Sequence, residues 1–299
     1  MDNFKSTRFE LLKQLAETGK VRSPELKQDT PPEFYAAYMD QVTIERYEVP
    51  CEQVGEPAVC YVIRAKDCAD KCPVFINIHG GGYVYPANEK DTMYCAHIAA
   101  EIHGIVVNVE YVTSDRMSYP APLEQCYEVA KWTFANCAAW GADPNRISIG
   151  GQSAGGCLTA AVNLRAAQQH DLGGKFRMQI LNYPILENYT ACEHPEKKRI
   201  HLFSMLYAGG NPQVLKEPLA SPIYANDEML KDQPHTVMVL AGKCFGRQDA
   251  TDYAVRLAGM GNEVTIRCFK DSHHGFLALL ADQWEEAQNY IIHCINRAV

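Results

Sequence analysis

Several features are missing from this chain, and each absence narrows the class of protein. No stretch of about 18 apolar residues could span a bilayer, and the first residues lack the apolar core of a signal peptide. No run rich in Lys and Arg stands out, and the formal net charge is −8. We therefore expect a cytoplasmic protein that has no nucleic-acid partner and no membrane partner.

The sequence also lacks a CxxC pair, although it contains 12 cysteines. Closely spaced cysteine pairs are typical of zinc knuckles and thioredoxin-type redox sites. Scattered cysteines in apolar periodic segments behave instead as small buried hydrophobic residues. We expect reduced thiols in a reducing compartment, with no bound metal and no cofactor.

The pattern of apolar residues favours an α/β fold. The chain has 299 residues, of which 47% are hydrophobic, and this is enough for one large core. Short apolar runs predict strands at residues 43–49, 59–64, 74–78, 105–109, 146–149, 178–181, 237–240 and 264–269. Longer segments with helical periodicity lie between most of them. This alternation predicts a three-layer α/β fold with a mostly parallel sheet.

Two segments interrupt the alternation and predict a helical cap. Residues 1–45 have helical periodicity, and residues 188–225 combine four prolines with a cluster of apolar side chains. We expect N-terminal cap helices at 1–45 and an α/β core at 46–299, with a cap insertion at 188–225. The aromatic candidates to line a pocket under this cap are Phe34, Tyr38, Phe203 and Tyr207.

Two glycine-rich motifs carry the chemistry. The sequence GQSAGG at 151–156 contains a G-x-S-x-G pattern between a predicted strand and a predicted helix, which is typical of a nucleophile elbow. A serine hydroxyl such as that of Ser153 becomes a good nucleophile when a neighbouring base takes its proton. The sequence HGGG at 79–82 follows another strand, and its backbone N–H groups can approach a ligand closely.

These motifs resemble the hormone-sensitive-lipase family of α/β-hydrolases, which includes many bacterial carboxylesterases. The resemblance extends from about residue 73 to residue 280 and also includes Tyr111, 119–122, 143–147, Tyr183-Pro184 and 274–276. It implies that Ser153 is the nucleophile and His274 the general base. It also implies an oxyanion hole formed by the N–H groups of Gly81, Gly82 and Ala154.

Three neighbouring polar residues have other expected roles. We expect the imidazole of His79 to brace the glycine loop rather than to act as a base. His273 is expected to be exposed or to lie behind the reacting groups. Gln152 stands where the family often has an acidic residue, and its amide is expected to alter local hydrogen bonds without touching the chemistry.

The acidic member of a Ser-His-Asp triad is the main departure from the family's pattern. Counting back from the helix that follows 237–240 puts Cys244 at the position of the family's aspartate. A thiol is a weak hydrogen-bond acceptor and is mostly neutral at pH 7. Three hypotheses remain open. A rearranged loop brings Asp249 to the histidine, Glu187 or Asp271 takes the role, or Cys244 leaves a Ser-His dyad without a strong acid.

The sequence therefore predicts a carboxylesterase that acts on small to medium acyl esters, with a small-molecule ester as its partner. Homodimerisation is left open. The alternative is a very slow or non-hydrolytic homologue with a role in ligand binding, elimination or cyclisation. That alternative follows from Cys244 at the position where an aspartate is expected.

Overall fold

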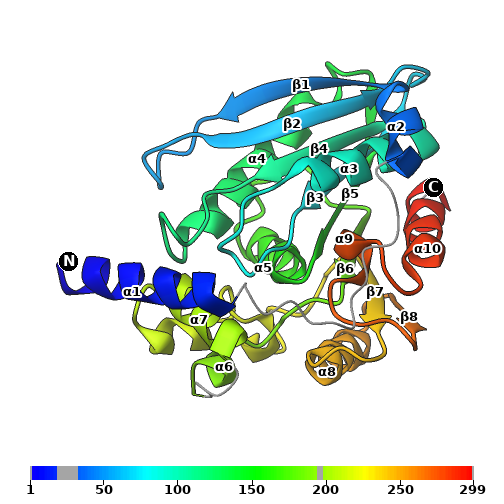
Figure 1. Cartoon of the computed structure of the whole chain (residues 1–299). Helices are drawn as coiled ribbons and strands as arrows, with labels where there is room; N and C mark the ends of the chain where they lie inside the picture. Colours follow the sequence, from blue (N-terminus) through cyan, green and yellow to red (C-terminus); the bar gives the residue numbers. More distant parts are fainter. Residues whose placement is uncertain (1, 19–32, 194–197, 298–299) are drawn as a thin grey trace.

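The computed structural model describes residues 2–18, 33–193 and 198–297, and an eight-stranded sheet forms its centre (Figure 1). The strands are β1 (Val42–Val49), β2 (Ala58–Ala65), β3 (Cys72–Ile78), β4 (Ile105–Glu110), β5 (Ala142–Gln152), β6 (Met178–Asn182), β7 (His235–Ala241) and β8 (Val264–Phe269). Their order is β1-β2-β4-β3-β5-β6-β7-β8. Only β2 runs antiparallel to its two neighbours within this sheet. The predicted mostly parallel α/β fold is confirmed.

Helices cover both faces of the sheet. The helices are α1 (Asp2–Thr18), α2 (Glu33–Met39), α3 (Glu89–Glu101), α4 (Ala121–Cys137), α5 (Ala154–Gln169), α6 (Tyr189–Glu193), α7 (Lys198–Tyr207), α8 (Arg247–Gly259), α9 (Phe276–Leu279) and α10 (Trp284–Arg297). Two short 3₁₀ helices are η1 (Pro212–Lys216) and η2 (Pro222–Tyr224). Buried side chains of α4, α5 and α8 pack on one face, and those of α3 and α10 pack on the other.

The central strands are buried on both faces, which explains their continuous apolar sequences. Every residue of β3 is buried. Along β3, Val74, Ile76 and Ile78 pack with α4 and α5, whereas Phe75 packs with α3 and α10. Successive side chains of a strand point to opposite faces, so a strand covered on both faces has no polar side.

The parallel arrangement brings the predicted catalytic residues to one edge of the sheet. The loops that follow β5, β7 and β8 contain Ser153, Cys244 and His274, respectively. Because the carboxyl ends of parallel strands meet at the same edge, these three loops converge there.

The two N-terminal helices lie in different places. Helix α1 packs along α7, where Leu11 and Leu15 contact Leu202 and Leu206 (Figure 1). Helix α2 packs instead on α3 on the opposite side of the molecule, and the ring of Phe34 lies 5.1 Å from that of Trp284. The expectation that residues 1–45 form cap helices as one group therefore differs from the observed packing, because the apolar face of α2 meets the core helices.

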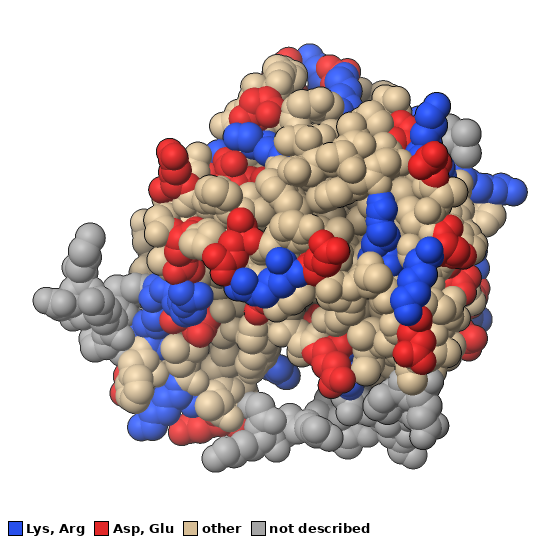
Figure 2. Space-filling view, turned by 90° about the horizontal axis from the view of Figure 1, so that it is seen from above, with Lys and Arg blue, Asp and Glu red and all other residues tan. Residues whose placement is uncertain are grey.

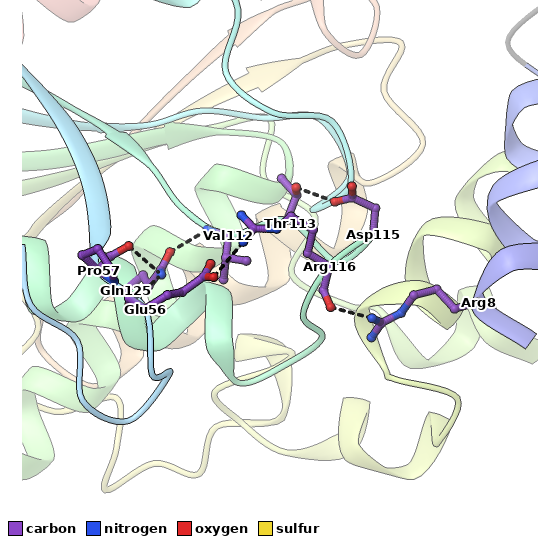
Figure 3. Close-up of polar contacts among 8 residues, drawn as sticks. All are labelled: Arg8, Glu56, Pro57, Val112, Thr113, Asp115, Arg116 and Gln125. Atoms are coloured by element: carbon purple, nitrogen blue, oxygen red, sulfur yellow. Dashed lines mark hydrogen bonds and ion pairs between the residues drawn. The ribbon is translucent and has the colours of Figure 1, made fainter. Parts of the chain in front are cut away.

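A polar network anchors α1 to the loop after β4 (Figure 3). The guanidinium of Arg8 donates to the backbone oxygen of Arg116, and it also donates to Ser118 Oγ. Arg116 in turn pairs with Glu56 at 2.7 Å. Gln125 accepts from the Val112 N–H and donates to two carbonyl oxygens before β2. The loop is therefore held both by α1 and by the edge of the core.

Candidate active site

Ser153 sits on a sharp turn between β5 and α5. Its φ of 55° and ψ of −115° are unusual for a residue with a side chain. The turn requires glycine on both sides, because a Cβ at Gly151 would lie 2.3 Å from the Gly155 oxygen. A Cβ at Gly155 would lie 2.1 Å from the oxygen of Ile78. These close approaches explain the glycines of the motif and leave the serine projecting from the end of the strand.

The hydroxyl of Ser153 meets the imidazole of His274. Oγ and Nε2 are 2.7 Å apart, which is within hydrogen-bond distance. Two aromatic rings contact the imidazole, with Tyr183 at 5.1 Å and Phe245 at 4.9 Å between ring centroids. The structure thus brings together two residues that are 121 positions apart in the sequence.

The other ring nitrogen of His274 faces a sulfur atom. Cys244 Sγ lies 3.0 Å from Nδ1, and the N–H of Gly246 donates to the same sulfur at 3.3 Å. If Nε2 accepts the proton of the Ser153 hydroxyl, Nδ1 carries a hydrogen and donates to Sγ. The sulfur then accepts from two N–H groups, which are contacts that a carboxylate would accept more strongly.

The three carboxylates considered as the triad acid lie elsewhere. Asp249 lies in the first turn of α8, which begins at Arg247. The group that contacts His274 Nδ1 is the sulfur of Cys244. Glu187 accepts from backbone N–H groups at the start of α6 and from the hydroxyl of Tyr224. Asp271 is exposed in the loop before the histidine. The geometry therefore differs from all three carboxylate expectations.

Burial shifts the pKa values of both members of the His274–Cys244 pair away from ionisation. Burial lowers the pKa of His274 to about 4. Burial also raises the pKa of the Cys244 thiol to about 11, and the negative charge of Asp249 adds to this effect. The N–H of Gly246 acts in the opposite direction on the thiol. At pH 7 the pair is therefore a neutral imidazole beside a neutral thiol.

The glycine loop after β3 lies beside the serine. Gly81 and Gly82 have φ values of 108° and 62° and line the same cavity as Ser153. Ala154 is the first residue of α5, so its N–H has no acceptor within the helix. His79 is buried with its ring stacked 4.3 Å from Tyr111, and its Nδ1 lies 2.7 Å from the Gly80 oxygen.

Two further residues support the histidine loop. His273 turns away from the serine, with its backbone N–H and its Nδ1 both near Asp282 Oδ2, at 2.7 and 3.1 Å. Gln152 accepts from the hydroxyl of Tyr183 at 2.7 Å. Because the Tyr183 ring contacts His274, this hydrogen bond fixes the orientation of one wall of the site.

The cavity at Ser153 has a volume of about 380 Å³. It is lined by the glycine loop, the histidine loop and helix α7, which contributes Arg199 and Phe203. Phe203 was predicted to line a pocket. Tyr207 stacks on Tyr83 at 3.8 Å and is fully buried, outside the cavity lining. Phe34 and Tyr38 contact His97 instead.

Sequence analysis did not single out three of the lining residues for a role in the site. Tyr183 follows β6 directly and belongs to the Tyr183-Pro184 pair of the family resemblance. Phe245 follows Cys244 in the loop after β7, so the available signal was the position of both residues in loops that follow strands. Arg199 had no comparable signal, because its place depends on how α7 packs against the core.

A larger cavity of about 620 Å³ lies at the opposite edge of the sheet. Its walls come from the C-terminal end of α5 and from residues just before β6, β7 and β8, such as Phe176, Pro234 and Glu263. Ligands of parallel α/β sheets bind beyond the carboxyl ends of the strands, whereas this cavity lies at the amino ends. The smaller cavity, which holds the Ser153–His274 pair, is therefore the candidate active site.

Within residues 2–18, 33–193 and 198–297, no group of three or more His, Cys, Asp or Glu side chains could hold a metal ion. Among the same residues, no helix combines the length and the apolar character needed to cross a membrane.

The fold and the Ser153–His274 contact define an α/β protein with a serine-histidine pair at an elbow turn. The chain belongs to the α/β-hydrolase fold family, because the family's sequence profile matches residues 75–278. The predicted resemblance to its hormone-sensitive-lipase-like members is confirmed.

Several proteins with similar sequences are named as esterases, deacetylases or α/β hydrolases. The chain is 31% identical to the esterase LipI of Mycobacterium tuberculosis over 70% of its own length and 68% of that protein. It is 25% identical to the arylacetamide deacetylase of Bos taurus, covering 72% and 71% of the two chains. A putative α/β hydrolase of Acanthamoeba polyphaga mimivirus is 27% identical over 67% of this chain, and the chain spans 60% of that relative's length.

Solved structures share the fold. Carboxyl esterase 2 of Tuber melanosporum superposes with a TM-score of 0.78 at 25% identity, covering 86% of this chain and 88% of that chain. A bacterial heroin esterase gives a TM-score of 0.78 at 24% identity, covering 96% and 97% of the two chains. The second likeness, at this identity, shows the fold alone. The expected α/β-hydrolase family with esterase-type relatives is thus confirmed.

Proposed function

We propose that this chain is a carboxylic ester hydrolase that acts on small to medium acyl esters. The observation that carries the proposal is the 2.7 Å contact between Ser153 Oγ and His274 Nε2 on a strained elbow turn. The esterase names of several relatives support the same reaction class. The cavity volume of about 380 Å³ is near the lower end of the range for small-molecule sites, which supports a small substrate.

In the proposed reaction, Ser153 Oγ attacks the carbonyl carbon of the ester while His274 Nε2 takes the hydroxyl proton. The N–H groups of the glycine loop and of Ala154 donate to the oxyanion of the tetrahedral intermediate. The bond to the alcohol oxygen then breaks, and the alcohol leaves with the proton from Nε2. A water molecule next attacks the acyl carbon and gives its proton to Nε2. Release of the acid restores the proton to the serine.

With the thiol of Cys244 in place of a carboxylate, we expect the Ser153–His274 pair to be a poor catalyst. A triad carboxylate fixes the histidine tautomer and stabilises the imidazolium that forms during the reaction. Cys244 can accept the Nδ1 hydrogen and so fix the tautomer. As a neutral thiol it supplies no negative charge to the imidazolium, so we expect a low kcat.

The same observation supports a second candidate function. If the imidazolium is too costly to form, the cavity serves as a ligand-binding, elimination or cyclisation site with very slow or no ester hydrolysis. The contact of Cys244 with Nδ1 favours this candidate. The Ser153–His274 contact favours the esterase.

The deciding experiment combines hydrolysis with covalent labelling. Hydrolysis of 4-nitrophenyl butyrate is measured for the wild type and for Ser153→Ala. In parallel, a fluorophosphonate is added to native and to heat-denatured protein, and the labelled peptide is identified by mass spectrometry. The esterase proposal predicts labelling of Ser153 in the native protein only and loss of hydrolysis in the variant. An inert Ser153 in the native protein would favour the second candidate.

We also propose that α1, α6 and α7 form a cap over this site. Leu11 and Leu15 of α1 pack on α7, whose Phe203 lies against Gly82 of the glycine loop. Deletion of residues 2–18 tests this role. The deletion is expected to change KM for a short acyl ester while the thermal unfolding of the core changes little, because the main contacts of α1 among the described residues are with α7.

We further propose a reducing, cytoplasmic setting for the chain. The cysteines that the structure describes are free, and most of them are buried. Buried thiols without disulfides suit a reducing compartment. A fluorescent fusion examined in the source cell tests this proposal, and secretion would contradict it.

A further inference from the structure

The cavity at Ser153 contains one permanently charged side chain among the described residues that line it. This side chain is Arg199 of α7, and the other lining residue that could carry a positive charge, His274, is neutral at pH 7. No Asp or Glu within the described part of the chain lines the cavity. The charge of the cavity is therefore positive, although the whole chain carries a net charge of −8.

Aromatic rings hold the guanidinium of Arg199. Its central carbon lies 5.6 Å from the ring centroid of Tyr85 and 5.5 Å from that of Phe203. These two rings meet edge to face at 5.7 Å and form one aromatic wall of the cavity. Stacking on rings leaves the N–H fork of an arginine available for a planar anion. Among the described residues, Arg199 forms no ion pair, whereas several other arginines pair with a carboxylate. On the face of the molecule in Figure 2, basic and acidic side chains are likewise interspersed.

Phe203 lies between Arg199 and the glycine loop beside Ser153. Phe203 lies against Gly82, because a Cβ at this glycine would be 2.4 Å from its ring. Arg199 precedes Phe203 by four positions on α7, so both side chains lie on the same face of the helix. The positive charge is therefore adjacent to the aromatic wall that covers the glycine loop.

We propose that the preferred substrates are esters that carry a carboxylate at the end remote from the ester bond. This inference rests on the proposed esterase function and adds the substrate class. The apolar part of such a substrate contacts the aromatic wall and Ile185, and its carboxylate accepts from the guanidinium of Arg199. A bidentate pair between arginine and a carboxylate is a strong and directional contact.

The kinetic test compares each charged ester with a neutral counterpart of almost the same shape. With the charge on the acyl side, the 4-nitrophenyl monoester of adipic acid is compared with 4-nitrophenyl methyl adipate. With the charge on the alcohol side, the hexanoate of 4-hydroxybenzoate is compared with the hexanoate of its methyl ester. In at least one pair, we expect a kcat/KM ratio favouring the anion, and Arg199→Gln lowers this ratio by about tenfold to a hundredfold.

A matched variant separates local contact from overall charge. Arg46 is exposed on β1 and pairs with Glu48, so Arg46→Gln removes the same charge away from the cavity. We expect Arg46→Gln to leave the ratio unchanged. Arg199→Lys, which keeps the charge but loses the fork, is expected to give an intermediate ratio.

A binding measurement makes the result independent of catalysis. The Ser153→Ala variant is titrated with the same esters by calorimetry, with and without Arg199→Gln. We expect the anionic ester to bind more tightly, and this preference to disappear in the double variant. If the preference for the anion is absent from binding and kinetics in both pairs, or survives Arg199→Gln, the anion site is wrong. If binding depends on Arg199 but the wild type hydrolyses no ester, the esterase function fails and the anion site stands.

Discussion

Cys244 Sγ and His274 Nδ1 lie 3.0 Å apart, at the place where a triad carboxylate would meet its histidine. The sulfur also accepts from the N–H of Gly246. Both N–H donors point at a group that cannot match the charge of an imidazolium. This relationship makes the efficiency of the site depend on one side chain.

Cys244→Asp is expected to raise kcat. An aspartate can accept the same two N–H groups and adds the negative charge that stabilises the imidazolium. Replacing the triad aspartate of a serine protease by its amide lowers kcat roughly 10⁴-fold, so restoring one is expected to raise kcat by about one to four orders of magnitude. Steady-state hydrolysis of 4-nitrophenyl butyrate measures the change.

The control for this variant is the same substitution at an exposed cysteine. Cys268 lies on β8 with its side chain exposed, so Cys268→Asp changes the net charge equally without reaching the histidine. A similar gain in both variants, or a loss in Cys244→Asp with the fold intact by circular dichroism, would contradict the role given to Cys244.

The pH dependence of kcat/KM is expected to have an unusually low acidic limb. An imidazole can act as a base only when it is neutral, and burial lowers the pKa of His274, the proposed base, to about 4. Activity is therefore present above that pH and is lost as the pH falls through about 4. In Cys244→Asp, the adjacent carboxylate favours the protonated ring and moves the limb to higher pH. A wild-type limb near the ordinary histidine value of about 6.5 would rule out this description.

Gly155→Ala is expected to destabilise the fold because the elbow has no room for a methyl group. A Cβ there would lie 2.1 Å from the Ile78 oxygen and 2.5 Å from that of His79, both of which are backbone atoms. The free energy of unfolding should fall by about 3 kcal/mol or more. Thermal unfolding of the variant measures this loss.

Gly259 provides the matched comparison. It ends α8, and a Cβ there would meet nothing within 4 Å. Gly259→Ala should therefore leave stability unchanged or raise it by up to about 1 kcal/mol, because alanine loses less backbone entropy in a helix. Equal effects of the two substitutions would show that the packing at Gly155 is not limiting.

Arg8→Ala is expected to loosen α1 without unfolding the core. The substitution removes the hydrogen bonds to the Arg116 oxygen and to Ser118 Oγ. Hydrogen bonds from a charged group contribute about 1–3 kcal/mol, so amide exchange in α1 should become faster by one to two orders of magnitude. Exchange in the central strands should not change. Arg46→Ala is the control, since its exposed pair with Glu48 lies on β1. Slow exchange in α1 of the Arg8 variant would assign the anchoring to Leu11 and Leu15 alone.

Most of the fold follows from local patterns in the sequence. The strand predicted at 264–269 has the same bounds as β8, and the helix predicted after the G-x-S-x-G pattern is α5, which begins at Ala154. These segments have strong periodicity or lie beside glycine motifs, and such signals act within a few residues. The elbow turn at Ser153 could be predicted for the same reason, because its G-x-S-x-G pattern occupies five consecutive positions.

The features that the sequence did not reveal depend on contacts between distant segments. Helix α2 has the aromatic residues of a cap helix, and its position beside α3 is decided by His97 and Trp284. Counting along the chain put Cys244 at the acid position, but only the folded loop shows which group faces Nδ1. The place of Arg199 in the cavity depends on the packing of α7 on the glycine loop.

The stacking of Tyr83 on Tyr207, at 3.8 Å, joins the glycine loop to α7. Phe203 forms a second contact between α7 and the glycine loop, since its ring occupies the space where Gly82 would carry a side chain. Substitutions in α7 that change substrate specificity are therefore expected to change kcat as well. We expect a library that varies α7 to accept new substrates also to shift the backbone of the proposed oxyanion donors, so it should be selected for turnover rather than for binding alone.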